Sequence, residues 1–182
     1  QAPSADIPRP NRIDVPHRLD GDELLPLLAA TRPTFLCMLP AALFALVRDH
    51  QATREHFGSL RLCVSGGDKV SGELEREFTA IAGKTIDELY GMTETGMSTV
   101  NPPDGTNKIG SIGKLVPGYE ASIRDAAGNE VPVGVEGRLW IRSAANMIGY
   151  WNRPDATAET IVDGWLDTGD VVAADEEGYL WF

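Results

Sequence analysis

The chain has 182 residues, of which 42% are hydrophobic and 24% are charged, proportions typical of a globular protein. Its formal net charge is −11: residues 1–100 carry 10 basic and 14 acidic side chains, and residues 101–182 carry 6 and 13. An acidic excess in both halves argues against a nucleic acid or an anionic membrane surface as the partner.

Cysteine and histidine usage points to neither a disulfide nor a metal centre. Cys37 and Cys63 lie in the apolar runs "TFLCML" and "LRLCVS", where we interpret them as small core residues. The three histidines have no partners at metal-ligand spacing. No apolar run approaches the ~20 residues of a membrane-spanning helix, and the polar N-terminus does not resemble a signal peptide. We therefore expect a protein of a reducing compartment, the cytoplasm.

The first part of the chain predicts alternating helices and strands. Residues 1–18 hold four prolines and predict an extended segment. "DELLPLLAA" predicts a short helix capped by Asp20 or Asp22. "TFLCML" predicts a buried strand, and "PAALFALVRDH" predicts a helix that begins at Pro40, because proline suits the first helical position.

Two more strands are predicted before residue 105. "LRLCVS" is followed by a helix that Ser71 would cap, with apolar residues at i, i+4 and i+7 and with Glu73 and Glu75 at its positive end. "KTIDELY" predicts the third strand. Because strands separated by helices pair in parallel, residues 19–105 are expected to form an α/β subdomain with a parallel-type layered sheet.

The pattern changes after this point. "YEASIRD", "GRLWIRS", "DTGDVVAAD" and "YLWF" are short extended runs separated by turn sequences, and a helical period returns only near "PDATAETI". We predict that residues 106–182 form a small antiparallel β-barrel-like subdomain, with no helix through residues 115–145.

Two consecutive predicted strands end in unusual sequences. One leads into Ser65-Gly66-Gly67-Asp68, and the next leads into the residues 90–94, "YGMTE". Ligands of open parallel sheets bind at the carboxyl ends of the strands, so both segments are expected at one ligand-binding edge. The two glycines lack a Cβ atom and allow the backbone to approach a flat ligand closely.

The stretch "LYGMTETG" offers a ring, a hydroxyl and a carboxylate rather than a nucleophile. Tyr90 can lie along a purine face, Thr93 can donate to a phosphate oxygen, and Glu94 can bind Mg²⁺. These properties predict a nucleotide clamp. The alternative is a tight turn in which Tyr90 packs on the core, Thr93 caps a following helical turn and Glu94 is exposed, with "SGGD" and "DTGD" as plain connections.

In combination, these segments resemble the acyl-adenylate-forming enzymes, which include acyl-CoA synthetases, peptide-synthetase adenylation domains and firefly luciferase. "LRLCVSGGDKVSGELEREF" resembles the strand-Gly-Gly-helix element of that family, and "YGMTETG" its Tyr-Gly-x-Thr-Glu motif. "IGSIGKLVPGYEASIRD" and "EGRLWIRSAANMIGYWNRPDATAETIVDGWLDTGD" resemble later motifs in the same order. The resemblance covers nearly all of residues 20–182.

The resemblance implies roles for individual residues. Tyr90 would pack on adenine, Asp170 would accept both ribose hydroxyls, Thr93 would contact phosphate, and Glu94 would bind magnesium, the last two being the catalytic pair. The implied nucleotide-binding residues are Gly66, Gly67, Asp68, Glu88, Leu89, Tyr90, Gly91, Met92, Thr93 and Asp170. The implied acyl-pocket residues are Ser65, Gly66, Gly91 and Met92.

The sequence also departs from the family pattern. Asp68 and Lys69 stand where the family usually has Ala-Pro, which bears on the shape of the pocket, and Leu115 stands where proline is common. The family's phosphate loop would precede Gln1, and its hinge, ribose-contacting arginine and catalytic lysine would follow Phe182. We therefore expect an internal piece of a longer enzyme that is inactive alone and whose exposed sheet edges favour self-association.

The leading functional hypothesis is part of an AMP-forming acyl-CoA synthetase, which uses ATP with Mg²⁺, a carboxylic acid and coenzyme A. One alternative is part of a peptide-synthetase adenylation domain. Another is a stand-alone nucleotide-binding module without catalysis. The parent reading frame separates them, because a phosphate loop upstream and a lysine-bearing domain downstream would eliminate the stand-alone module.

Overall fold

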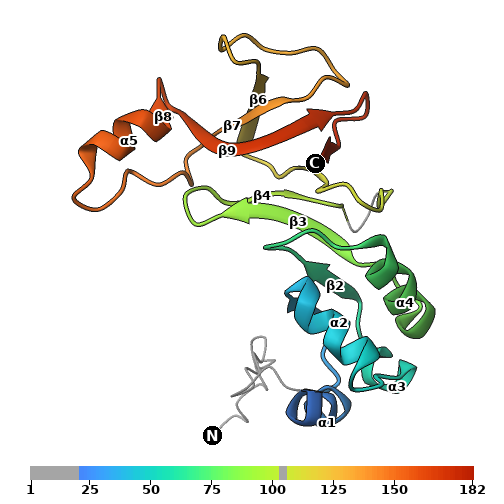
Figure 1. The fold of residues 1–182 in the computed structure, drawn as a ribbon. Coiled ribbons are helices and arrows are strands. Elements are labelled where there is room, and N and C mark those ends of the chain that lie inside the picture. Colours follow the sequence, from blue (N-terminus) through green and yellow to red (C-terminus); the bar gives the residue numbers. More distant parts are fainter. Residues whose placement is uncertain (1–20, 103–105) are drawn as a thin grey trace, which may run out of the picture.

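The computed structural model describes residues 21–102 and 106–182 as two stacked sheets with helices on the first (Figure 1). The predicted extended segment of residues 1–18, and Asp20 as a helix cap, lie outside the described residues. Within the described residues, no helix is long and apolar enough to span a membrane.

The first sheet has the order β1-β2-β3-β4-β5. Its strands β1, β2 and β3 pair in parallel, as predicted from the alternation of helices and strands. Helix α3 is short and was not predicted. The elements of this part are α1 (Gly21–Thr31), β1 (Phe35–Met38), α2 (Pro40–Arg48), α3 (Arg54–Phe57), β2 (Leu62–Ser65), α4 (Gly72–Ala82), β3 (Asp87–Met92), β4 (Gly96–Val100) and β5 (Lys114–Leu115).

Local sequence signals set the helix ends. Helix α2 begins at Pro40, and Ser71 caps α4 by accepting a hydrogen bond from the backbone N–H of Leu74 at 3.1 Å. Helix α4 ends at Gly83, which adopts φ 69°. Phe78 on α4 is fully buried and packs on Phe57 with ring centroids 5.1 Å apart, so the predicted apolar face of α4 forms the first core.

The third strand differs from its prediction. It starts at Asp87 and continues through Met92, so Tyr90 to Met92 belong to a strand, and β4 then returns antiparallel to it. Gly91 makes this reversal possible, because a Cβ atom there would collide with the backbone carbonyl of Gly96. The predicted α/β class with a parallel-type sheet is confirmed, and the antiparallel strands β4 and β5 are an addition to it that was not predicted.

The second sheet is antiparallel and has the order β10-β9-β7-β6, with β8 paired to β9. Its inner face supplies fully buried Leu139, Ile141 and Val172 to a second core. No helix occurs in residues 115–145, as predicted. The elements are β6 (Tyr119–Arg124), β7 (Gly137–Ser143), α5 (Pro154–Thr160), β8 (Ile161–Val162), β9 (Trp165–Ala174) and β10 (Leu180–Trp181). Since β5 joins the first sheet, the proposed division at residues 105/106 stays a prediction.

Glu75 lies in the first turn of α4 as predicted, but it is buried, with 2% of its surface exposed. Its carboxylate accepts hydrogen bonds from the backbone N–H of Ile86, at 3.1 and 3.2 Å to its two oxygens, and from the hydroxyl of Thr79 at 3.3 Å. Burial raises the pKa of Glu75 above its ordinary value despite these bonds. The side chain thus joins α4 to the chain entering β3 and has an unfavourable charge at neutral pH.

We predict that Glu75→Gln weakens the pH dependence of stability. Because its folded-state pKa is raised, the folded chain binds more protons than the unfolded chain above the ordinary value of 4.5, so stability falls as pH rises from there. Glutamine keeps an acceptor for Ile86 without the charge, whereas Glu75→Ala leaves that N–H unpaired at a cost of about 1–3 kcal/mol. Urea unfolding from pH 4.5 to neutral measures both effects. An unchanged slope in Glu75→Gln would contradict the prediction, even though buried Asp87 and Glu88 retain part of it.

Candidate nucleotide-binding site

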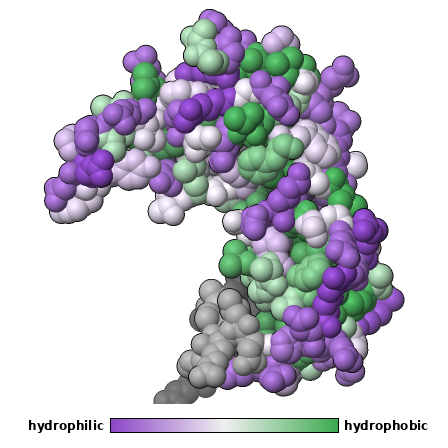
Figure 2. Space-filling model, viewed as in Figure 1, coloured by the Kyte–Doolittle hydropathy of each residue, from purple (hydrophilic) through white to green (hydrophobic). Residues whose placement is uncertain are grey.

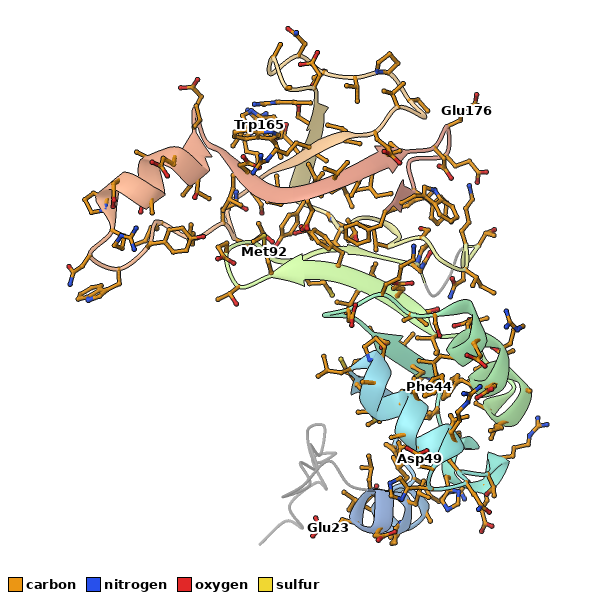
Figure 3. The ribbon with its side chains drawn as sticks, in the orientation of Figure 1. Glu23, Phe44, Asp49, Met92, Trp165 and Glu176 are labelled. Atoms are coloured by element: carbon orange, nitrogen blue, oxygen red, sulfur yellow. The ribbon has the colours of Figure 1, made fainter. Side chains whose placement is uncertain are left out.

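A cavity of about 420 Å³ lies where the two sheets meet. The connection from β2 to α4 lines one side with residues 67–69, and β3 lines another with residues 88–92. Ile112, Asp170 and Phe182 complete the wall. Met92, labelled in Figure 3, marks the end of β3 that faces the second sheet. Chain segments far apart in sequence therefore build one site.

Tyr90 and Asp170 meet inside this cavity. The phenolic hydroxyl of Tyr90 donates a hydrogen bond to Oδ2 of Asp170 at 2.6 Å. Burial, followed by this bond to Asp170, raises the pKa of Tyr90, so the phenol stays a neutral donor. Thr168 in turn accepts a hydrogen bond from the backbone N–H of Asp170 at 3.1 Å. The carboxylate is thereby oriented before any ligand binds.

The glycine pair allows close approach of two backbones. A Cβ atom on Gly66 would lie 2.7 Å from the carbonyl oxygen of Leu89, so the glycine lets the β2–α4 connection touch β3. Gly67 adopts φ +85° and lines the cavity together with Asp68, which accepts a hydrogen bond from the backbone N–H of Lys69 at 2.7 Å. Gly67 and Asp68 therefore line the cavity, whereas Gly66 lies outside its lining and brings the connection close to β3.

The remaining predicted residues divide into two groups. Glu88, Leu89, Gly91 and Met92 line the cavity. Glu88 is 4% exposed, and burial raises its pKa. In contrast, Ser65 is outside the lining: it is fully buried, and its hydroxyl donates to the carbonyl of Met38 at 2.8 Å.

Thr93 and Glu94 lie in the turn between β3 and β4, outside the cavity lining. Thr93 is exposed, and Glu94 is half-buried. The carboxylate Oε1 of Glu94 accepts a hydrogen bond from the hydroxyl of Tyr150 at 2.9 Å. The alternative interpretation of this stretch as a tight turn agrees with the packing of Tyr90 in a core. It does not agree in its second part, because strand β4 follows the turn and there is no helix there for Thr93 to cap.

Four residues of the site were not among the predicted site residues, and one of them, Lys69, lines the cavity next to Asp68. Ile112 and Phe182 line the cavity, and the Phe182 ring meets that of Tyr90 edge to face, with centroids 5.8 Å apart. Tyr150 reaches Glu94 from the second sheet's side of the molecule. The sequence predicts a strand for "YLWF" and a family motif for "MIGYW", but no site role for their aromatic residues. The positions of these side chains depend on long-range packing.

Comparison with known proteins identifies the family. The model of the family described as AMP-binding enzyme matches residues 13–151. A long-chain-fatty-acid–CoA ligase of Yersinia pestis is 42% identical over 137 residues, covering 75% of this chain and 24% of the relative. A fatty acid–[acyl-carrier-protein] ligase, ScoC, of Streptomyces coeruleorubidus is 35% identical over 153 residues, covering 81% and 30%.

A solved structure has the same fold. The ATP-bound crystal structure of MatB from Rhodopseudomonas palustris superposes with a TM-score of 0.83 and 35% identity, covering 89% of this chain and 32% of that one. The chain thus spans about a quarter to a third of the length of the relatives that it matches. On the family match and the shared fold, the chain belongs to the AMP-binding enzyme family.

Proposed function

We propose that the chain is part of an AMP-forming acyl-CoA synthetase and forms the adenosine side of its nucleotide site. The parent enzyme would convert a carboxylic acid and ATP to an acyl-adenylate, and then form the thioester with coenzyme A. The observation that carries this proposal is the Tyr90–Asp170 hydrogen bond inside a cavity lined by the glycine backbone. The coenzyme A ligase among the relatives supports the reaction class.

The cavity suits an uncharged nucleoside. Adenine would lie between the backbone of Gly66 to Asp68 and Tyr90, and the carboxylate of Asp170 would accept the ribose hydroxyls. Three carboxylates, those of Asp68, Glu88 and Asp170, line the cavity, and Lys69 supplies the one cationic side chain among the described lining residues. Phosphates would therefore be repelled from the interior and would extend toward the rim.

Thr93 and Glu94 follow directly after the lining residues Gly91 and Met92, so the phosphates of the proposed ligand would reach this turn. Magnesium typically uses one or two carboxylates together with substrate phosphates and water. Among residues 21–102 and 106–182, no cluster of three or more His, Cys, Asp or Glu is placed to hold a metal ion. A single carboxylate at Glu94 thus fits a magnesium ion shared with ATP better than an ion held by protein alone, and Thr93 would donate to a phosphate oxygen. The ion would supply compensation of the phosphate charge.

The acceptor of the acyl group can be coenzyme A or a carrier protein. Both kinds of ligase occur among the relatives, at 42% and 35% identity. The higher identity favours coenzyme A and a role in fatty acid metabolism, whereas no described contact favours the peptide-synthetase alternative. Cys37 and Cys63 are free thiols, which fits the cytoplasm.

Self-association of the isolated chain also stays a prediction. Strand β1 is the last strand of the first sheet, and Phe35 on it is 54% exposed. Leu39, which follows β1, is 55% exposed. Unpaired sheet edges with apolar neighbours favour association between chains.

The proposed activity is tested in a protein that contains this chain and has the full length of the matched relatives. We expect pyrophosphate release from ATP that depends on an added carboxylic acid, followed by thioester formation with coenzyme A. Fatty acids of increasing length, each offered with coenzyme A and with acyl carrier protein, identify the substrate and the acceptor. ATP consumption that ignores every acid would contradict the proposal.

Asp170→Asn is expected to weaken adenosine binding by at least about tenfold. Hydrogen bonds to a charged group contribute roughly 1.5–3 kcal/mol, and each 1.4 kcal/mol is about tenfold in affinity. Nuclear magnetic resonance titration of the chain with adenosine measures the change without phosphate repulsion. Asp167→Asn is the matched control, because Asp167 pairs with Arg138 at 2.6 Å and lies outside the cavity lining. Equal losses in the two variants would refute ribose recognition by Asp170.

The 182-residue chain by itself is expected to show no adenylation and to bind ATP only at millimolar concentration or weaker. Its net charge is −11, and one lysine faces the cavity. Each well-placed donor to developing charge contributes about 2.7–4 kcal/mol in such reactions, and Lys69 alone cannot replace several. Calorimetry at high magnesium, together with a pyrophosphate release assay, checks this. Micromolar ATP affinity without turnover would instead favour the stand-alone nucleotide-binding module.

A further inference from the structure

Three hydrogen bonds attach the β3–β4 turn to later parts of the chain. The hydroxyl of Tyr150 donates to Oε1 of Glu94 at 2.9 Å, and the backbone N–H of Met147 donates to the carbonyl of Glu94 at 2.7 Å. From the other side, the hydroxyl of Tyr119 donates to the carbonyl of Thr95 at 2.7 Å. Glu94 is therefore held at both its backbone and its carboxylate, whereas Tyr119 holds only the backbone of the turn.

Tyr150 is itself fixed by helix α5. The hydroxyl of Thr157 accepts a hydrogen bond from the backbone N–H of Tyr150 at 2.9 Å and donates to the carbonyl of Arg153 at 2.8 Å. Gly149 adopts φ +150°, and a Cβ atom there would lie 2.8 Å from Cγ2 of Thr157. The glycine thus lets the chain pass close enough to α5 for this bond, and α5 determines where the Tyr150 backbone lies.

Core packing does not explain this arrangement. Helix α5 contains no buried residue. The segment from the end of β7 through α5, residues 144–160, is called the α5 arm; it projects to the left in Figure 1 and has a largely hydrophilic to neutral surface in Figure 2. Next to Tyr150, Ile148 is 102% exposed and Trp151 is 90% exposed. Tyr150 is the residue of this segment whose side chain turns back to a predicted site residue.

We propose that Tyr150 is a positioning residue for Glu94, supported by Thr157 and Gly149. This inference rests on the proposed function, in which Glu94 shares a divalent cation with nucleotide phosphates. A half-buried carboxylate without a fixed partner samples several rotamers, and ordering it on binding costs free energy. A donor at Oε1 selects one rotamer in advance and leaves the second oxygen for the cation, as partners of metal ligands do in other sites.

The test uses Mn²⁺ alone as a paramagnetic probe of the 182-residue chain, because paramagnetic broadening detects even the weak binding that a single carboxylate gives without nucleotide phosphates. Titration with MnCl₂ broadens amide resonances near the bound ion, which reports both the affinity and the location. Tyr150→Phe is expected to weaken Mn²⁺ binding at residues 93–95 by about tenfold or more, within the 10–100-fold range typical for partners of metal ligands. Tyr119→Phe, the matched control, loses the same group at the same turn and is expected to bind Mn²⁺ like the unmodified chain.

Two further variants keep the outcomes distinct. Thr157→Val keeps the phenol of Tyr150 but removes the acceptor of the Tyr150 backbone N–H, and is expected to weaken Mn²⁺ binding by an intermediate factor. This variant gives an independent result if circular dichroism shows that Tyr150→Phe changes the fold. Glu94→Gln is expected to abolish the broadening. Loss in Glu94→Gln with unchanged affinity in Tyr150→Phe and Thr157→Val overturns the positioning role alone. Broadening that persists in Glu94→Gln overturns the metal assignment of the proposed function as well.

Discussion

The hydrogen bond between Tyr90 and Asp170 connects β3 of the first sheet to β9 of the second, across 80 residues of sequence. A buried phenol without an acceptor loses free energy, so the bond helps to fix how the two sheets meet. The same bond orients a carboxylate into the cavity between them. Fold stability and the proposed ribose recognition therefore share one contact, because the residue that satisfies the buried hydroxyl is also the proposed ribose acceptor.

Charge is distributed unevenly around this contact. Inside the cavity, the buried carboxylate of Glu88 accepts a hydrogen bond from the backbone N–H of Val70 at 3.2 Å, and Lys69 lies close enough to lower its pKa partly. Outside the cavity lining, in the turn after β3, the carboxylate of Glu94 accepts a hydrogen bond from Tyr150 instead. A nucleotide has the matching asymmetry, with an uncharged purine at one end and phosphates at the other. In the proposed function, recognition of the nucleoside and compensation of the phosphate charge would therefore use different residues.

The features that could be predicted from the sequence are those that local interactions determine. Pro40 and Ser71 mark helix starts through their own backbone geometry and hydrogen bonding, and the glycines after β2 mark a close backbone approach. Strand β4 escaped prediction because its buried Ser98 and Thr99 look like loop residues until distant partners are known. Thr99 donates to the carbonyl of Ile112, and Ser98 donates to the hydroxyl of Thr95 at 3.0 Å. Tyr150 was missed for the same reason, since α5 and the turn at Glu94 meet only in the folded chain.

The exposed position of the α5 arm has a thermodynamic consequence for the metal site. Segments with few buried contacts open at lower free energy than the core, and α5 buries no residue. A cation that binds more tightly when Tyr150 holds Glu94 would stabilise the arrangement in which this hydrogen bond is formed, because a ligand stabilises whichever state binds it. On the proposed role of Tyr150, order in the arm and cation affinity at Glu94 would therefore be linked, each favouring the other. The proposed nucleoside binding uses the cavity around Tyr90, which α5 does not line, whereas the proposed charge compensation at Glu94 would be strengthened by an ordered arm.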